Sequence, residues 1–183
     1  MNGPAQRSDE DLLAGVAAGD DLALAALAGR YARGVYDFAL RATLDPTVSA
    51  NVAQATFKRA SEGASEKPAQ ISFRTWLYSL ALVEVLAVAN ERSTSRLSLG
   101  DPRFTHTAPP QEHEVALWAW QAARSLRTRD YCVLDLTLRR ELAPEELADA
   151  AALTRNNLYA SIGRARGAFE DSFAATALYL RGR

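Results

Sequence analysis

The apolar residues of this chain recur at intervals of three and four positions along most of its length, and nowhere do they alternate with polar ones. The stripe between positions 20 and 44 is the clearest example, and its members are Leu24, Leu27, Tyr31, Val35, Phe38 and Leu44. The spacings within this stripe, of three, four and six residues, fit a helical period of 3.6 residues and not the period of two that a half-buried strand requires. The sequence therefore predicts an all-α fold without a β-sheet.

Caps and breakers divide this pattern into separate helices. Ser8 precedes three acidic residues, which is typical of an N-cap followed by a first turn that complements the helix dipole. Gly19 ends that helix, and Asp45-Pro46 stops the next one and starts a third. Later helices are predicted over residues 72–90, 112–125, 128–140, 144–152 and 156–180. The helix over 72–90 is apolar around most of its circumference and should lie at the centre of the first bundle.

A change of composition divides the helices into two groups. Residues 91–111 are rich in Ser, Thr, Pro, Arg and Gly and lack apolar periodicity, which is typical of a linker. We therefore expect two small helical bundles joined by a linker. The predicted boundaries are a first domain over 8–91, a linker over 92–111, a second domain over 112–175 and a C-terminal tail over 176–183.

Several functional classes are disfavoured by composition. A single cysteine, Cys132, and two histidines in a Pro-rich stretch leave too few ligands for a metal site, and no Gly-rich phosphate loop is present. We expect no metal, no cofactor and no enzymatic activity. The longest apolar run, Leu80–Ala89, is interrupted by Glu84 and is shorter than a membrane span. The N-terminus is acidic and has no apolar core of a signal peptide, so a cytoplasmic location is expected.

The stretch from Leu142 to Phe169 has the pattern of a helix-turn-helix. A short helix with an apolar face is followed by a tight polar turn and a second helix with a polar face, and Thr154 can cap that second helix. The outward residues of this recognition helix would be Arg155, Asn156, Asn157, Tyr159, Ala160 and Arg164. Arg and Asn side chains suit base edges, and Arg also reaches phosphate. The alternative is a helical hairpin with a solvated face.

Several motifs occur in the order found in extracytoplasmic-function sigma factors of the sigma-70 family. The run FRTWLY at 73–78 resembles the signature of region 2, and QATFKRA at 54–60 resembles another segment of that region. LRTRDY at 126–131 and EELA at 145–148, followed by TRNNLY at 154–159, resemble region 4 and its helix-turn-helix. The resemblance covers about residues 9–175.

This resemblance implies a sigma factor that binds the RNA polymerase core and directs it to promoter DNA. Region 2 would bind the core and capture the unpaired minus-10 element, and region 4 would read the minus-35 element as duplex. The implied minus-35 contacts are Thr154, Arg155, Asn156, Asn157, Tyr159, Ala160 and Arg164. The implied minus-10 contacts are Phe73, Arg74 and Trp76, and the implied core contacts are Asn51, Gln54, Phe57 and Arg59. An anti-sigma factor or a fused regulatory extension is the further partner typical of the family.

The chain also departs from the family pattern. Ala50 and Asn51 stand where acidic residues are usual, and Tyr159 and Ser161 stand where lysine and arginine are common. Residues 1–100 hold ten basic and eleven acidic side chains, which is unfavourable for gripping a DNA strand unaided. Trp76, at helical spacing from Phe73, also suits a core position. Two alternatives follow: a diverged sigma-like adaptor or regulator that binds polymerase or another protein without reading promoters, and a transcription factor whose region 4-like domain acts alone.

Overall fold

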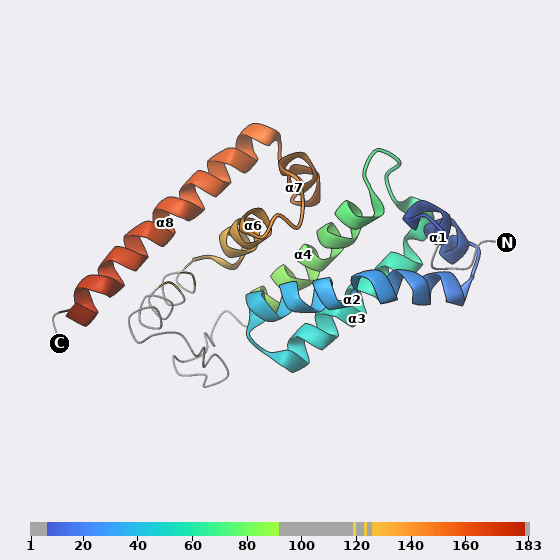
Figure 1. Ribbon diagram of the computed structural model, residues 1–183, viewed down its shortest axis with the longest axis horizontal. Coiled ribbons are helices and arrows are strands. Elements are labelled where there is room, and N and C mark those ends of the chain that lie inside the picture. Colours follow the sequence, from blue (N-terminus) through green and yellow to red (C-terminus); the bar gives the residue numbers. More distant parts are fainter. Residues whose placement is uncertain (1–6, 92–118, 120–122, 124–125, 182–183) are drawn as a thin grey trace.

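The computed structural model describes residues 7–91, 119, 123 and 126–181, and it describes the side chains of 7–89, 119, 123 and 126–174. Over these residues the chain forms seven α-helices, one short 3-10 helix and no strand, which confirms the predicted all-α class. The elements are α1 (Asp9–Ala17), α2 (Asp21–Thr43), α3 (Pro46–Glu62), η2 (Ala64–Glu66), α4 (Phe73–Glu91), α6 (Thr128–Leu138), α7 (Pro144–Ala150) and α8 (Arg155–Arg181). Figure 1 shows an elongated molecule with α1 and the C-terminal end of α8 at opposite ends. The predicted linker and most of the predicted helix over 112–125 lie outside the described residues.

The predicted helix starts are confirmed by their capping contacts. The Ser8 hydroxyl accepts a hydrogen bond from the backbone N–H of Asp11 at 3.1 Å, at the start of α1. Asp20 accepts from two backbone N–H groups at the start of α2, and Asp45 does the same at the start of α3, with Pro46 in the first turn. These contacts occupy N–H groups that have no partner within the helix.

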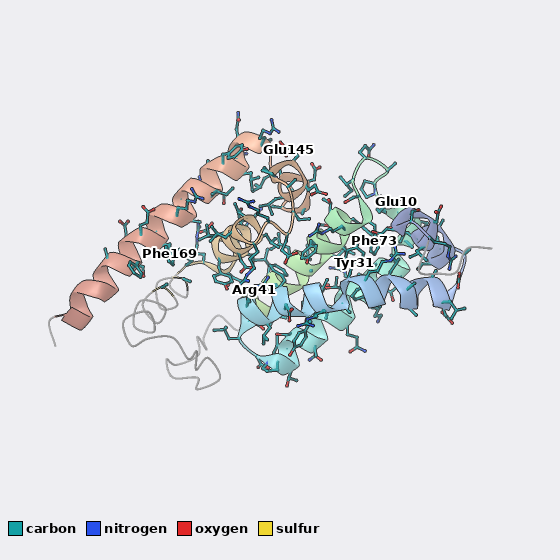
Figure 2. All side chains as sticks on the ribbon, in the orientation of Figure 1. Glu10, Tyr31, Arg41, Phe73, Glu145 and Phe169 are labelled. Atoms are coloured by element: carbon teal, nitrogen blue, oxygen red, sulfur yellow. The ribbon has the colours of Figure 1, made fainter. Side chains whose placement is uncertain are left out.

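The N-terminal bundle consists of α1, α2 and α3 packed with α4. Phe38, Phe73 and Leu77 are among its fully buried side chains. Phe73 makes edge-to-face ring contacts with Tyr31 and Trp76, at centroid distances of 5.5 and 6.2 Å, and Figure 2 shows Tyr31 and Phe73 side by side. Helix α4, predicted to be central in this bundle, packs against α1, α2 and α3 and also against α6 and α7, so it lies between the two bundles.

The C-terminal bundle consists of α6, α7 and α8. Helix α8 packs against α6 and α7 through its N-terminal part, and its C-terminal end extends beyond both of them (Figure 1). Leu136, Leu147 and Leu158, one from each helix, are fully buried. Helix α6 ends two residues before the predicted Arg140, because Arg140 adopts a left-handed backbone conformation with a φ of 54°.

The two bundles are in contact and share one cluster of buried apolar residues. This cluster runs from Leu12 in α1 to Leu158 in α8, and α4 contacts α6 and α7 along it. The prediction of two helical bundles is confirmed, and the described residues of the two bundles pack on each other. Periodicity identifies which face of a helix is buried and does not say which helix covers it. None of the described helices is both long and apolar enough to cross a membrane.

Candidate nucleic-acid interface

Helices α7 and α8 form the predicted helix-turn-helix. The backbone N–H of Ala143 donates to Glu146 Oε2 at 2.8 Å before α7 begins. In the turn, Leu153 N donates to the Ala148 carbonyl at 2.8 Å, and Ala152 has a left-handed backbone with a φ of 53°. Asn157 N donates to Thr154 Oγ1 at 3.3 Å, which confirms that Thr154 caps the second helix. The turn is therefore fixed by local hydrogen bonds.

The angle between the two helices is held by small and apolar side chains. Leu147, Ala148 and Ala151 are buried on one side of the motif, and Leu158 is buried on the first turn of α8. Because closely packed interiors deform little, α8 presents its other face to solvent in a defined direction.

The residues predicted to read DNA lie on that solvent face. All of them are exposed: Thr154, Arg155, Asn156, Asn157, Tyr159, Ala160 and Arg164. Arg155 forms an ion pair with Glu145 of α7 (Figure 2 labels Glu145 at this end of α8). Ser161 is buried, so its neutral side chain is not a missing basic contact on this surface. Whether these residues bind DNA stays a prediction.

The three predicted minus-10 residues lie at the start of α4 and are differently placed. Phe73 and Trp76 are buried in the N-terminal bundle, so in this conformation neither ring is available to stack on a base. Arg74 is half-buried, and its Nη2 lies 3.3 Å from Glu141 Oε2, in the chain between α6 and α7. Their role in binding DNA also stays a prediction.

The four residues predicted to bind polymerase lie on α3. Asn51, Gln54 and Arg59 are exposed and Phe57 is half-buried, whereas Val52 and Thr56 between them face the core. Arg59 Nη1 pairs with Glu84 Oε1 of α4 at 2.9 Å. The structure therefore leaves this side of α3 accessible, and polymerase binding remains untested.

A set of polar contacts between the two bundles could not be foreseen from the sequence. Arg41 Nε donates to both carboxylate oxygens of Asp135, at 3.0 and 3.1 Å. The Tyr78 hydroxyl donates to Glu141 Oε2 at 3.2 Å, beside Arg74. No local pattern marks these partners, because the residues in each pair are 94 and 63 positions apart.

A second carboxylate from the C-terminal bundle reaches the start of α4. Glu146 Oε1 accepts from the hydroxyls of Thr75 at 3.1 Å and Ser72 at 3.4 Å. The other oxygen of Glu146 accepts from Ala143 N, as described above. One side chain therefore stabilises the start of α7 and ties it to α4.

Two of the buried side chains in this region, Tyr78 and Cys132, have a raised pKa. Burial, followed by the negative charge of Glu141, raises the pKa of Tyr78 to about 12. Burial, together with the nearby Asp135 carboxylate, raises the pKa of the Cys132 thiol, which therefore stays protonated at neutral pH. In the part of the chain that the structure describes, no three His, Cys, Asp or Glu side chains are grouped so that they could hold a metal ion.

Comparison with known proteins shows that this chain is similar in fold to a solved structure. No family model matches this chain, and no curated protein matches its sequence. Among solved structures, the chain is similar to the structure of CnrH in complex with the cytosolic domain of CnrY, with a TM-score of 0.66 and 22% sequence identity. The similarity covers 91% of this chain and 97% of the solved chain, and so it includes both bundles. CnrH is an extracytoplasmic-function sigma factor, and at 22% identity the likeness shows that the two chains share an all-α fold.

Proposed function

We propose that the protein is an RNA polymerase sigma factor of the extracytoplasmic-function type. The observation that carries this proposal is the fold shared with CnrH over both bundles, combined with a helix-turn-helix whose polar face is exposed. Neither feature suffices alone, because one fold can serve several functions and helical hairpins with solvated faces are common.

The residues divide into three roles under this proposal. The exposed face of α8, from Thr154 to Arg164, reads the minus-35 element in the major groove. The start of α4, with Phe73, Arg74 and Trp76, takes part in binding the minus-10 element. The accessible side of α3, with Asn51, Gln54, Phe57 and Arg59, binds the polymerase core. Duplex reading by a helix in the major groove and strand capture by aromatic and basic side chains are physically distinct tasks, which suits two bundles.

The proposal implies particular partners and no catalytic chemistry of the protein's own. The partners are the polymerase core, promoter DNA and an anti-sigma protein or regulatory extension. Because the polymerase and its promoters are in the cytoplasm, the proposal locates the protein there. The complex of CnrH with the cytosolic domain of CnrY supports a protein partner of the regulatory kind. The nearly balanced charge of the chain is acceptable under this proposal, since the polymerase supplies most of the attraction for DNA.

A sigma-like adaptor that binds polymerase without reading promoters is the second candidate. The burial of Phe73 and Trp76 and the pairing of Arg155 with Glu145 favour it, because these side chains are then engaged within the protein itself. Both candidates bind the polymerase core, and only the first directs transcription.

Copurification with the polymerase core, followed by run-off transcription on genomic DNA, separates the two candidates. A sigma factor binds the core and starts transcription at discrete sites. An adaptor binds the core and gives no discrete transcripts. Failure to bind the core would contradict both candidates and would favour a protein whose C-terminal bundle acts on DNA alone.

A further inference from the structure

The arginines on the exposed side of α8 differ in their partners. Arg155, in the first turn, forms an ion pair with Glu145 of α7. Arg164 and Arg166 are also exposed, but among the described residues neither of them has a carboxylate partner. The side chains of Arg155 and Glu145 are 60% and 58% exposed, so the pair lies on the solvent face of the helix-turn-helix. A carboxylate therefore restrains Arg155, whereas Arg164 and Arg166 have no such restraint.

The backbone that carries this ion pair is fixed at both ends. Glu146, which follows Glu145, caps the start of α7, and the Thr154 hydroxyl caps α8 immediately before Arg155. Apolar side chains of both helices are buried on the opposite side of the motif. Because packed interiors deform little, the spacing between the two helix starts is set by this packing. The Glu145 carboxylate is therefore presented to Arg155 from a defined direction.

The ion pair engages only part of the guanidinium group. The contact uses Nη2 of Arg155, and within the described part of the chain Nη1 and Nε have no partner. A guanidinium carries five N–H donors in one rigid plane. A guanine in the major groove accepts two hydrogen bonds from such a group, at O6 and N7. Arg155 can therefore donate to a guanine while Glu145 holds it.

The charge of α7 determines what this pair does to the attraction for DNA in general. The seven residues of α7 include Glu145, Glu146 and Asp149 and no basic residue. The first helix of a helix-turn-helix crosses the DNA backbone, so exposed carboxylates on α7 weaken the attraction for phosphates. Glu145 also offsets the charge of Arg155, which then contributes little to the binding of an arbitrary sequence.

We propose that Glu145 determines sequence specificity by positioning Arg155 toward a guanine of the DNA duplex and by keeping it from acting as a general phosphate contact. This inference rests on the proposed function, because it takes the exposed face of α8 as a DNA-reading surface. Glu145 acts through Arg155 and is a positioning residue. An arginine that is ordered before binding loses less side-chain freedom when it contacts its base. Since exposed ion pairs are weak, the gain in specificity is a few-fold.

The test uses the complex of the full chain with the polymerase core. One promoter found by run-off transcription supplies a set of duplexes, each with one base-pair replacement in the upstream element. Competition among these duplexes measures the preference at every base pair. Binding to a duplex of unrelated sequence measures the general attraction for DNA.

Three variants and one control are compared with the wild type. Glu145→Gln removes the carboxylate charge, Arg155→Ala removes the guanidinium, and the double variant combines both changes. Asp149→Asn is the matched control, because it also removes one exposed negative charge from α7. Asp149 lies one helical turn from Glu145, on the same side of the helix, and has no ion pair among the described residues.

Glu145→Gln should have two opposite effects. It should lower the preference at one G·C base pair about threefold and tighten binding to unrelated sequence about twofold, because the released Arg155 reaches phosphates. Asp149→Asn should tighten binding to unrelated sequence and leave the preference unchanged. Arg155→Ala should lower the preference at the same base pair by about tenfold. Adding Glu145→Gln to Arg155→Ala should cause no further loss of preference there.

The results that would overturn the inference are distinct from failure of the proposed function. A wild-type complex that shows no preference at any base pair contradicts the proposed function, and this inference falls with it. A wild-type preference that Glu145→Gln leaves unchanged overturns this inference alone. The same conclusion follows if Glu145→Gln weakens the preference at all base pairs equally, as damage to α7 would, or if it acts equally without Arg155.

Discussion

Asn157 and Arg164 lie two turns apart on the same exposed side of α8, in positions that suit different contacts with DNA. Asn157 is close to the start of the helix, where side chains reach base edges when the helix enters the major groove. Arg164 is further along and suits a contact with the backbone phosphates. The pair therefore separates sequence reading from electrostatic attraction.

Asn157→Ala should weaken binding to the preferred promoter by about 1–3 kcal/mol and relax the preference at one base pair. Arg164→Ala should weaken binding to every sequence alike and reduce the salt dependence by about one unit. Binding of the polymerase complex to promoter variants at several salt concentrations measures both effects. If neither variant altered promoter binding, the role of α8 in reading DNA would be contradicted.

Ala152 carries a local backbone strain within the turn of the helix-turn-helix. Its φ of 53° lies in the left-handed region, which costs a residue with a Cβ roughly 1–2 kcal/mol and costs glycine little. Ala152→Gly should therefore raise the free energy of unfolding by about 0.5–1 kcal/mol, after the greater flexibility of glycine in the unfolded chain is subtracted.

Urea denaturation measures this change in stability. Ala168→Gly, at an exposed and regular position of α8, is the matched control and should lower stability by about 1 kcal/mol. Destabilisation by both substitutions would show that the turn does not hold Ala152 in the left-handed conformation.

At the scale of the elements, the sequence predicted the helices well because their ends are determined locally. Ser8, Asp20 and Asp45 each act within three residues of the position they occupy, so their effect can be read from the chain. The pairing of α4 with the region between α6 and α7 could not be read in this way. Glu141 has no feature in the sequence that indicates a contact with Arg74, 67 residues away.

The same reasoning explains the outcome for the candidate sites. The exposed face of α8 follows from helical periodicity and was predicted residue by residue. The helical spacing of Trp76 from Phe73 suited a core position, and its burial agrees with that interpretation. The ring contact between Phe73 and Tyr31 joins two different helices, which periodicity does not describe. Ser161 stands where arginine or lysine is common in the family, and its burial shows that position in a motif does not establish exposure.

Tyr78 in α4 should make the free energy of unfolding depend on pH in the alkaline range. The pKa of this phenol is raised from 10.0 to about 12 in the folded protein, first by burial and then by the charge of Glu141. A raised pKa means that the contribution to stability is complete below pH 10 and is lost as the pH rises from 10 to 12. The free energy of unfolding should therefore fall over this interval.

Tyr78→Phe tests this dependence, because it removes the ionising group and retains the ring. Urea denaturation of both proteins between pH 9 and 11 should show a shallower decline for the variant. Some decline should remain, since burial, together with the nearby Asp9 carboxylate, also raises the pKa of Tyr31 to about 12. Identical slopes would show that Tyr78 is not buried beside Glu141 in solution.

At the scale of the whole molecule, residues 91–111 separate the two bundles in the sequence and have no apolar periodicity. Limited proteolysis should therefore cut this segment first and release two fragments. Helix α4 is buried along most of its length, so its peptide bonds should resist early cleavage. Early cuts within residues 73–90, identified by mass spectrometry, would contradict the packing of α4 at the centre of the N-terminal bundle.

The measurement that tests the central claim most directly is the mapping of transcript 5′ ends produced from genomic DNA by the polymerase core, with and without this protein. The account predicts new start sites that appear only with the protein and share a common sequence upstream, and that lose this preference with Asn157→Ala. Transcripts that are the same in both reactions, while the protein is bound to the core, would contradict the assignment as a sigma factor.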